Sequence, residues 1–332
     1  MARTRPDGRL MMLALALALT LASWACSEPP SVAVGPTLTE ADFSRPWAFR
    51  DRVGSGKGMV AVTAGHAGLV ALPDFPLTEG KLVLSTRNLV ARSSDGLNWT
   101  ERRIEPDGHY EAIAYGQRTY VIVGGSAIAG STGKILASVD GQRWTLVHES
   151  TALLRQVRFT EAGFVAIGKL GLIVLSKDGQ SWTESRDVAR ADLSDAAFGQ
   201  GRFVAVGKAL LVSSDGGNVW TPVTCEALAG CSSPLALKRV VFGNGAFVTT
   251  GSHFLRSGDG LTWTEVAEAA GAVAVVGDRF VFLGDDFRLA DSRDGAMWTE
   301  RPAVTNAPTL ETCLTATCLL LDRGFLLIPR GP

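Results

Sequence analysis

Short apolar runs separated by turn residues recur along most of the chain. In several of them two apolar or aromatic side chains stand five positions apart with Gly, Asn or Asp between them, and a run such as Tyr120-Val121-Ile122-Val123 follows. This pattern is typical of tight antiparallel hairpins, in which the two side chains face each other. It predicts an all-β chain. The pairs are Tyr115 with Tyr120, Phe159 with Phe164, Phe198 with Phe203, Phe242 with Phe247, and Val275 with Phe280.

A second motif lies in register with these hairpins. Five segments have the form Ser-x-Asp-Gly-x-x-Trp, and a sixth carries one extra residue. The tryptophans are 45, 38, 38, 43 and 35 residues apart. A period of about 40 residues is typical of the four-stranded blades of a β-propeller. The Ser, Asp and Trp of the six copies are Ser93, Asp95 and Trp99; Ser138, Asp140 and Trp144; Ser176, Asp178 and Trp182; Ser213, Asp215 and Trp220; Ser257, Asp259 and Trp263; and Ser292, Asp294 and Trp298.

Each repeat predicts one strand before the hairpin, one after it, a third that ends at Ser-x-Asp and a fourth at Trp-Thr. Six such units end at Trp298. Residues 310–329 supply three further strands without a closing motif, and the segment around Trp47 is available as the fourth. We therefore expect a seven-bladed β-propeller of four-stranded blades, closed by joining the N- and C-terminal strands. Six blades are the alternative.

The repeated turns resemble those of the Asp-box, or BNR-repeat, family of β-propellers, which includes sialidases, sortilin-type receptors and photosystem II assembly-factor-like proteins. The family pattern is Ser-x-Asp-x-Gly-x-x-Trp. The copy from Ser213 to Trp220 has that length, and the other five are one residue shorter. In this family the box lies at the blade periphery and serves structure. The resemblance implies that Asp215 and its counterparts form turns and take no part in catalysis.

The N-terminus has the pattern of a secretory signal. Three arginines precede the apolar run Leu10 to Ala22, which is too short to span a bilayer. The segment that ends at Ala25-Cys26 resembles a bacterial lipobox, and ordinary cleavage after Ala25 is the alternative. We expect a signal peptide over 1–25, a proline-containing linker over 26–40 lipid-anchored at Cys26, and the propeller over 41–332. Ser27 resembles an outer-membrane sorting signal, so we expect an exported protein on that membrane, otherwise a secreted one.

Four further cysteines form two close pairs. In an exported chain an even remainder favours two local disulfides, and four free thiols are the alternative. No histidine or second pair lies near either one at the spacing of zinc ligands. The pairs are Cys225 with Cys231 and Cys313 with Cys318.

The charge balance disfavours a nucleic-acid partner. The whole chain carries a formal net charge of −1, and removing the leader, which holds three arginines and one aspartate, lowers it to about −3. No block of Lys and Arg forms the basic stripe that phosphate binding requires. We expect a monomer with a protein or glycan partner, attached to the membrane through its lipid anchor only, and without cofactor or metal.

A catalytic set is not apparent. A sialidase needs an arginine cluster, a tyrosine nucleophile with a glutamate, and an acid/base group. The three tyrosines, Tyr110, Tyr115 and Tyr120, fall in one repeat, and two of them form a hairpin pair. We therefore expect a non-enzymatic binding or assembly scaffold at the bacterial cell envelope. The alternative is a carbohydrate-binding or glycoside-hydrolysing, sialidase-like propeller.

Propeller geometry places a ligand site on the face formed by loops after the second strand and loops before the first. Two long insertions, from Pro73 to Arg87 and from Gly124 to Lys134, are expected on the same face. A solvated rim without a specific ligand is the alternative, because charged loop ends are common on soluble proteins. The possible ligand rim consists of Glu111, Arg155, Lys169, Asp195, Lys208, Arg239, His253 and Asp286.

Overall fold

The computed structural model of the chain describes thirteen ranges between Trp47 and Pro329. Contacts divide the chain into Met1–Ala33 and Val34–Pro332, and every described residue belongs to the second unit. The predicted signal peptide, lipidation site and linker, all five cysteines, Asp95 and Asp286 lie outside the described residues. The ranges are 47–50, 52–53, 57–73, 88–94, 98–126, 132–186, 190–224, 235–267, 271–284, 288–302, 305–306, 319–321 and 325–329.

The described residues form six four-stranded sheets and one five-stranded sheet. The five-stranded sheet contains β2 (Arg52–Val53), β3 (Lys57–Gly65), β4 (Gly68–Pro73), β5 (Leu89–Ser93) and β6 (Thr100–Arg103). The next contains β7 (His109–Gly116), β8 (Thr119–Gly125), β9 (Gly133–Ser138) and β10 (Thr145–Ser150). The third contains β11 (Leu154–Thr160), β12 (Gly163–Gly168), β13 (Leu172–Ser176) and β14 (Thr183–Arg186), with the 3-10 turn η1 (Lys169–Gly171) between β12 and β13.

The remaining sheets follow in chain order. They contain β15 (Leu193–Gly199), β16 (Arg202–Gly207), β17 (Leu210–Ser213) and β18 (Thr221–Pro222); β19 (Leu237–Gly243), β20 (Ala246–Gly251), β21 (Phe254–Ser257) and β22 (Thr264–Ala267); and β23 (Gly271–Val276), β24 (Arg279–Gly284), β25 (Leu289–Ser292) and β26 (Thr299–Arg301). The last sheet has the order β27 (Thr305–Asn306), β1 (Trp47–Arg50), β29 (Phe325–Pro329) and β28 (Leu319–Leu321).

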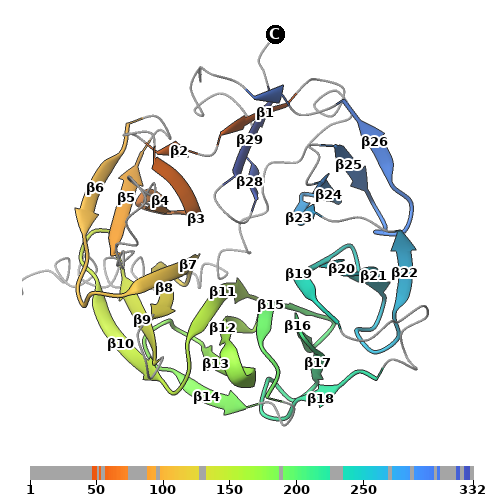
Figure 1. The fold of residues 1–332 in the computed structure, drawn as a ribbon, viewed down its shortest axis with the longest axis horizontal. Coiled ribbons are helices and arrows are strands. Elements are labelled where there is room, and N and C mark those ends of the chain that lie inside the picture. The colour runs from red at the N-terminus through yellow and green to blue at the C-terminus, as the bar shows by residue number, and fades with distance from the viewer. Residues whose placement is uncertain are drawn as a thin grey trace, which may run out of the picture. The chain divides into compact units, whose positions relative to one another are not determined.

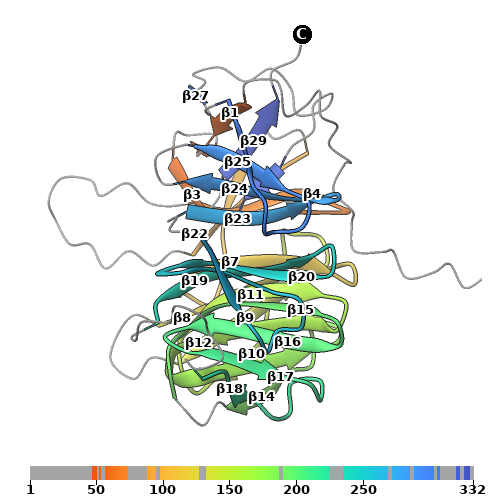
Figure 2. The same ribbon diagram turned by 90° about the vertical axis from the view of Figure 1, so that its right-hand side faces the viewer.

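Neighbouring strands are antiparallel except for β1 and β27, which are parallel. In six of the sheets the strands pair in the order of the sequence, as expected for meanders joined by short turns. Consecutive sheets contact each other through the strands β3, β7, β11, β15, β19 and β23. Figure 1 shows these strands innermost and β6, β10, β14, β18, β22 and β26 outermost within this unit, and Figure 2 gives the same sheets from the side. Strand β1 pairs with β29, which joins the predicted Trp47 segment to the C-terminal strands.

The predicted aromatic hairpins are confirmed by the strand register. Tyr115 faces Tyr120, and the ring centroids are 4.6 Å apart. The three Phe–Phe pairs have centroid distances of 4.7–4.8 Å, which is within the range of favourable aromatic contacts. They are Phe159 with Phe164, Phe198 with Phe203, and Phe242 with Phe247.

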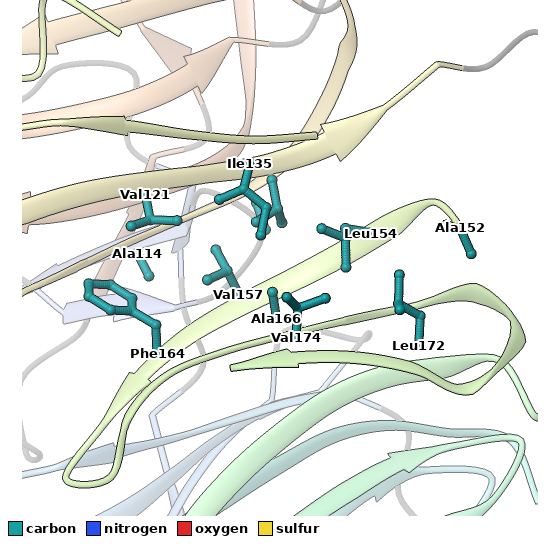
Figure 3. Close-up of a cluster of buried hydrophobic side chains, with 12 residues drawn as sticks. Ala114, Val121, Ile135, Ala152, Leu154, Val157, Phe164, Ala166, Leu172 and Val174 are labelled. Atoms are coloured by element: carbon teal, nitrogen blue, oxygen red, sulfur yellow. The ribbon is translucent and has the colours of Figure 1, made fainter. Parts of the chain in front are cut away.

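The core lies between consecutive sheets. Figure 3 shows one such layer, in which Val121 and Ile135 of the β7 sheet lie against Val157 and Phe164 of the β11 sheet. All four side chains are at most 1% exposed. Similar layers separate the β11 sheet from the β15 sheet, and the β15 sheet from the β19 sheet. In the β7, β11, β15 and β19 sheets alternation along the strands therefore buries both faces, because each of these four sheets packs against a neighbour on either side.

The Ser-x-Asp-Gly turns are held by their own side chains. In the turn of Ser257 the hydroxyl accepts the Gly260 N–H at 2.7 Å, and Asp259 Oδ1 accepts the N–H groups of Leu261 and Thr262 at 2.9 and 2.8 Å. Trp263 Nε1 donates to the Gly260 carbonyl at 3.0 Å. These bonds satisfy the turn amides locally, as Asp and Ser do in tight turns. The Asp side chains at Asp140, Asp178, Asp215 and Asp294 accept the same type of bond.

Candidate functional site

The loops expected to carry a ligand lie together at one end of the sheets. In three consecutive sheets, the residue after the second strand donates its backbone N–H to a carbonyl of the segment that precedes or begins the first strand, at 2.9, 2.9 and 3.0 Å. We call this end the upper face. The tight turns between first and second strands lie at the other end. The bonded pairs are Lys169 with Leu153, Lys208 with Asp192, and Ser252 with Ala236.

A β-bulge near the start of the first strands sets which side chains reach the upper face. The pairing of β11 with β12 shifts between Leu154 and Gln156, so Arg155 is the extra residue. The same shift makes Lys238 the extra residue of β19. Because a bulge leaves its extra residue unpaired and redirects its side chain, both cations project outwards and are exposed. The equivalent residues of the β7 and β15 sheets are half-buried: Glu111 and Ser194.

Asp195 and Arg239, which the sequence placed in the exposed rim, are buried in the structure. Their exposed fractions are 0% and 8%. Each stands one position after its bulge, where the side chain turns in between the sheets. The prediction places both residues in the loops that lead into the first strands, whereas β15 and β19 begin at Leu193 and Leu237 and carry an extra residue, so both side chains lie in the sheet interior. Lys238, the exposed neighbour of Arg239, was missed for the same reason.

The buried Asp195 carboxylate joins three sheets. Arg158 of β11 donates to it from two nitrogens, each at 2.9 Å. The N–H groups of Ala196 and Val240 donate at 2.9 and 3.2 Å, and Arg239 lies 3.9 Å away. A buried carboxylate is tolerated only when it is paired and hydrogen-bonded, and both conditions hold here. The cluster fixes the strands β11, β15 and β19 beneath the exposed cations of the upper face.

The connection between β12 and β13 projects an apolar side chain onto the upper face. Leu170, in the turn η1, has φ 57° and ψ 32° and is 62% exposed. This left-handed conformation is uncommon for residues other than glycine. The Leu170 N–H donates to Asp192 Oδ1 at 3.2 Å, and the ammonium of Lys208 lies 3.5 Å from Asp192 Oδ2. Asp192 therefore holds both the strained turn and a cation of the next sheet.

The pKa of Asp192 reflects these contacts. Partial burial by itself would raise its pKa, but the Leu170 N–H and the positive charges of Lys208 and Arg155 outweigh burial and hold it below the usual value. Asp192 is thus ionised at neutral pH and is engaged by its own neighbours. Neither Asp192 nor Leu170 was singled out from the sequence. The glycines that flank Lys169-Leu170 were the available signal of an unusual turn.

The fold is shared with solved structures of low sequence identity. A structure described as YCF48 bound to D1 peptide matches with a TM-score of 0.59 and 16% identity, over 90% of this chain and 100% of that chain. YCF48 from Cyanidioschyzon merolae matches with a TM-score of 0.56 and 14% identity, over 86% and 98%. The WD40 β-propeller domain of Doa1 matches with a TM-score of 0.57 and 12% identity, over 86% and 97%. No family model matches the chain, and no curated protein matches it.

The chain is a β-propeller. Its remaining rim residues occupy different settings on the upper face: Lys169 is half-buried and Lys208 is exposed. His253 is 9% exposed and its Nδ1 lies 3.1 Å from Glu265 Oε1, which makes it an interior group paired with a carboxylate. Most of the two long insertions lies outside the described residues, as does Asp286.

The propeller's three tyrosines are engaged in structural contacts. Tyr110 is fully buried, donates to the Pro106 carbonyl at 2.6 Å, and has a pKa raised by burial. Tyr120 donates to a backbone carbonyl at 3.0 Å. The Tyr115 hydroxyl lies 2.7 Å from His66 Nδ1, at the turn between first and second strands and away from the upper face. A tyrosine nucleophile requires an accessible hydroxyl with an adjacent base in the ligand site, and none of the three has that setting.

The described ranges show neither a metal site nor a membrane-crossing helix. They contain no group of three or more His, Cys, Asp or Glu side chains arranged to hold a metal ion. Within them, no helix combines the length and hydropathy needed to cross a bilayer. Two surface grooves, of about 540 and 380 Å³, are lined largely by the Ser-x-Asp-Gly turns and the strands that flank them. The upper face presents the exposed cations Arg155, Lys208 and Lys238 and the exposed side chain of Leu170. The strands beneath them are joined by the buried Asp195 carboxylate.

Proposed function

We propose that this propeller is a non-enzymatic binding or assembly scaffold that holds a polypeptide segment on its upper face. The observation that carries the proposal is the exposure of Arg155, Lys208 and Lys238 at one end of three consecutive sheets, where a backbone hydrogen bond joins the two connections of each sheet. A rigid array of cations binds without a large ordering cost, because its side chains stand on a fixed backbone. Such an array attracts an oppositely charged partner and orients it.

The similar structures support a polypeptide as the ligand class. One of them is described as YCF48 bound to D1 peptide, so a protein of this fold binds a peptide. The tyrosines of this chain, by contrast, are built into hairpins and the core, which favours binding over glycoside hydrolysis. We infer that the propeller acts as a scaffold.

The proposal is tested by charge reversal on the upper face. Arg155→Glu and Lys208→Glu are compared with Arg118→Glu, which changes an exposed cation in the turn at the opposite end of the β7 sheet. Partners captured from an envelope extract on immobilised protein are identified by mass spectrometry, after thermal melts have shown that the variants fold. The upper-face variants should lose the partner that wild type and Arg118→Glu retain. Equal recovery by all four proteins contradicts the proposal.

We further propose that the scaffold is exported and tethered to a bacterial membrane by a lipid on Cys26. The motivation is the apolar leader, the small residue Ala25 before the cysteine, and the proline-containing linker that follows. Palmitate labelling that is lost in Cys26→Ala and is sensitive to globomycin supports the tether. An unlabelled wild-type protein rules it out and leaves ordinary secretion.

We propose an Asp-box propeller of seven blades, closed where β1 joins the C-terminal strands. The pairing of β1 with β29 and the side-chain bonds of the Ser-x-Asp-Gly turns support it.

We propose disulfides within the pairs Cys225–Cys231 and Cys313–Cys318. Intact mass should rise by the hydrogens of two bridges on reduction, and an unchanged mass refutes both.

A further inference from the structure

Leu170 stands out on the upper face because its backbone is strained and its side chain is exposed. Single exposed leucines are common and need no explanation. A leucine held in the left-handed region at φ 57° is different, because the conformation is costly unless the surroundings impose it. The turn that carries it has one residue more than the equivalent turns of the next two sheets, which have two residues between the strands, Lys208-Ala209 and Ser252-His253. Leu170 is the middle residue of this longer turn, and its side chain is 62% exposed.

The turn is held from both sides. Lys169 N–H donates to the Leu153 carbonyl at 2.9 Å within the same sheet. Leu170 N–H donates to Asp192 Oδ1 at 3.2 Å in the next sheet. The Leu170 side chain is therefore presented on a backbone fixed to two sheets, and it does not fold back against the protein, since 62% of its surface remains exposed.

Positive charge surrounds this apolar tip. Lys169 precedes it, and the ammonium of Lys208, 70% exposed, lies 3.5 Å from the carboxylate that also accepts the Leu170 N–H. Arg155 is exposed on the strand that follows Leu153, and its charge acts on the same carboxylate. Asp192 is engaged by these neighbours, so the surface that a partner meets is apolar at the centre and cationic around it.

We propose that Leu170 is the apolar anchor of the upper face and that its partner is an extended segment carrying an apolar side chain flanked by acidic residues. The inference rests on the proposed polypeptide function of this face and specifies the partner's chemistry. The acidic residues face Lys169, Lys208 and Arg155, and the apolar side chain covers Leu170. Anchors of this kind dominate binding when surrounding contacts exclude water from them.

The test is a titration of purified full-length protein with three fluorescent peptides of equal length. One has a Leu-Phe pair flanked by glutamates, one replaces that pair with Ser-Ser, and one replaces the glutamates with lysines. Wild type should bind the first peptide most tightly, the second more weakly, and the third not measurably. Failure of wild type to prefer the first peptide overturns the inference.

Substitutions at Leu170 and Lys208 distinguish the contribution of the apolar side chain from that of the surrounding cations. Leu170→Asn removes the apolar side chain but keeps a residue that tolerates the left-handed backbone, and Val219→Ala is the control at an apolar side chain that is 64% exposed on a Ser-x-Asp-Gly turn. Leu170→Asn should lower the affinity for the first peptide about tenfold, as expected for one buried leucine, and leave the affinity for the second peptide unchanged. Lys208→Glu should lower the affinity for both of these peptides. If Leu170→Asn has no effect while Lys208→Glu does, the anchor is wrong and the cationic site stands; if neither has an effect, the proposed function of this face fails as well.

Discussion

Arg158 on β11 donates two hydrogen bonds of 2.9 Å to Asp195 on β15, whose side chain has no exposed surface. The bond crosses from one sheet to the next, and Asp195 also accepts the N–H of Val240 from the sheet beyond. One carboxylate thus bonds three sheets near the centre of the propeller. The exposed cations of the upper face are positioned by this buried cluster, because Arg155 and Lys238 stand on the strands that it joins.

Replacing Asp195 by alanine should destabilise the propeller substantially. The substitution leaves Arg158 and Arg239 without their carboxylate and removes the acceptor of two buried N–H groups. Breaking a buried pair by removing one partner costs about 3 kcal/mol or more, and the partial exposure of Arg158 places the expected loss near the lower end. Urea unfolding measures it. Asp278→Ala is the matched control, because the Asp278 side chain is 53% exposed and its Arg293 partner is 69% exposed, so its loss should stay below about 0.5 kcal/mol.

The hairpins and turns were readable from the sequence, whereas the composition of the upper face was not. The register of a hairpin such as that of Phe242 and Phe247 can be predicted from the sequence, because local turn chemistry fixes the spacing of the pair. Asp195 and Arg239 were misplaced because a bulge leaves no clear mark in the sequence and shifts the inward and outward positions by one. The Leu170 turn is bonded to Asp192 of the next sheet, 22 residues further along the chain, and such contacts are set by packing between sheets.

The aspartates of the Ser-x-Asp-Gly turns predict a loss of stability in acid. Backbone N–H groups donate to these carboxylates and hold their pKa values below the usual range, most strongly at Asp140. A carboxylate with a lowered folded-state pKa stabilises the protein above its unfolded-state pKa, near 3.8, and loses this contribution as the pH falls through the folded-state value. The urea midpoint should therefore decline steadily below about pH 4.

A single turn isolates this effect. Asp259→Asn keeps an oxygen that accepts the N–H bonds of Leu261 and Thr262 but does not titrate. The variant should be less stable than wild type at neutral pH, and the difference should shrink as the pH falls. A difference that is constant with pH would show that the Asp259 charge contributes nothing to the turn.

Gly116 should not tolerate a side chain. A Cβ atom at this position would clash with the ring carbons Cγ, Cδ1 and Cδ2 of Phe159, which belongs to the next sheet. Overpacking of a tight contact costs about 1–3 kcal/mol, so Gly116→Ala should lower the free energy of unfolding by that amount. Gly258→Ala serves as the comparison, because nothing lies within 4 Å of a Cβ added there. Adding Phe159→Leu to Gly116→Ala should restore part of the loss; no recovery would place the clash elsewhere.

The strained turn at Leu170 predicts an unusual response to glycine. Glycine adopts a positive φ without steric cost, so Leu170→Gly should leave the unfolding free energy unchanged or raise it by up to about 1 kcal/mol. In the strand β10, where Leu146 does not have a positive φ, Leu146→Gly should reduce it, since glycine weakens strands. Thermal or urea unfolding of both variants decides the matter. Equal losses in the two would show that the Leu170 backbone is not strained.

Site-specific photo-crosslinking tests the binding role of the upper face most directly. A photoreactive amino acid is placed at Ser194, half-buried at the bulge of β15 between Arg155 and Lys238, and separately at Gln117, exposed in the turn at the other end of the β7 sheet. Irradiation of cells that express the full-length protein should trap a polypeptide partner through position 194 and none through position 117. Crosslinks from position 117 alone, or from both positions equally, would contradict the account.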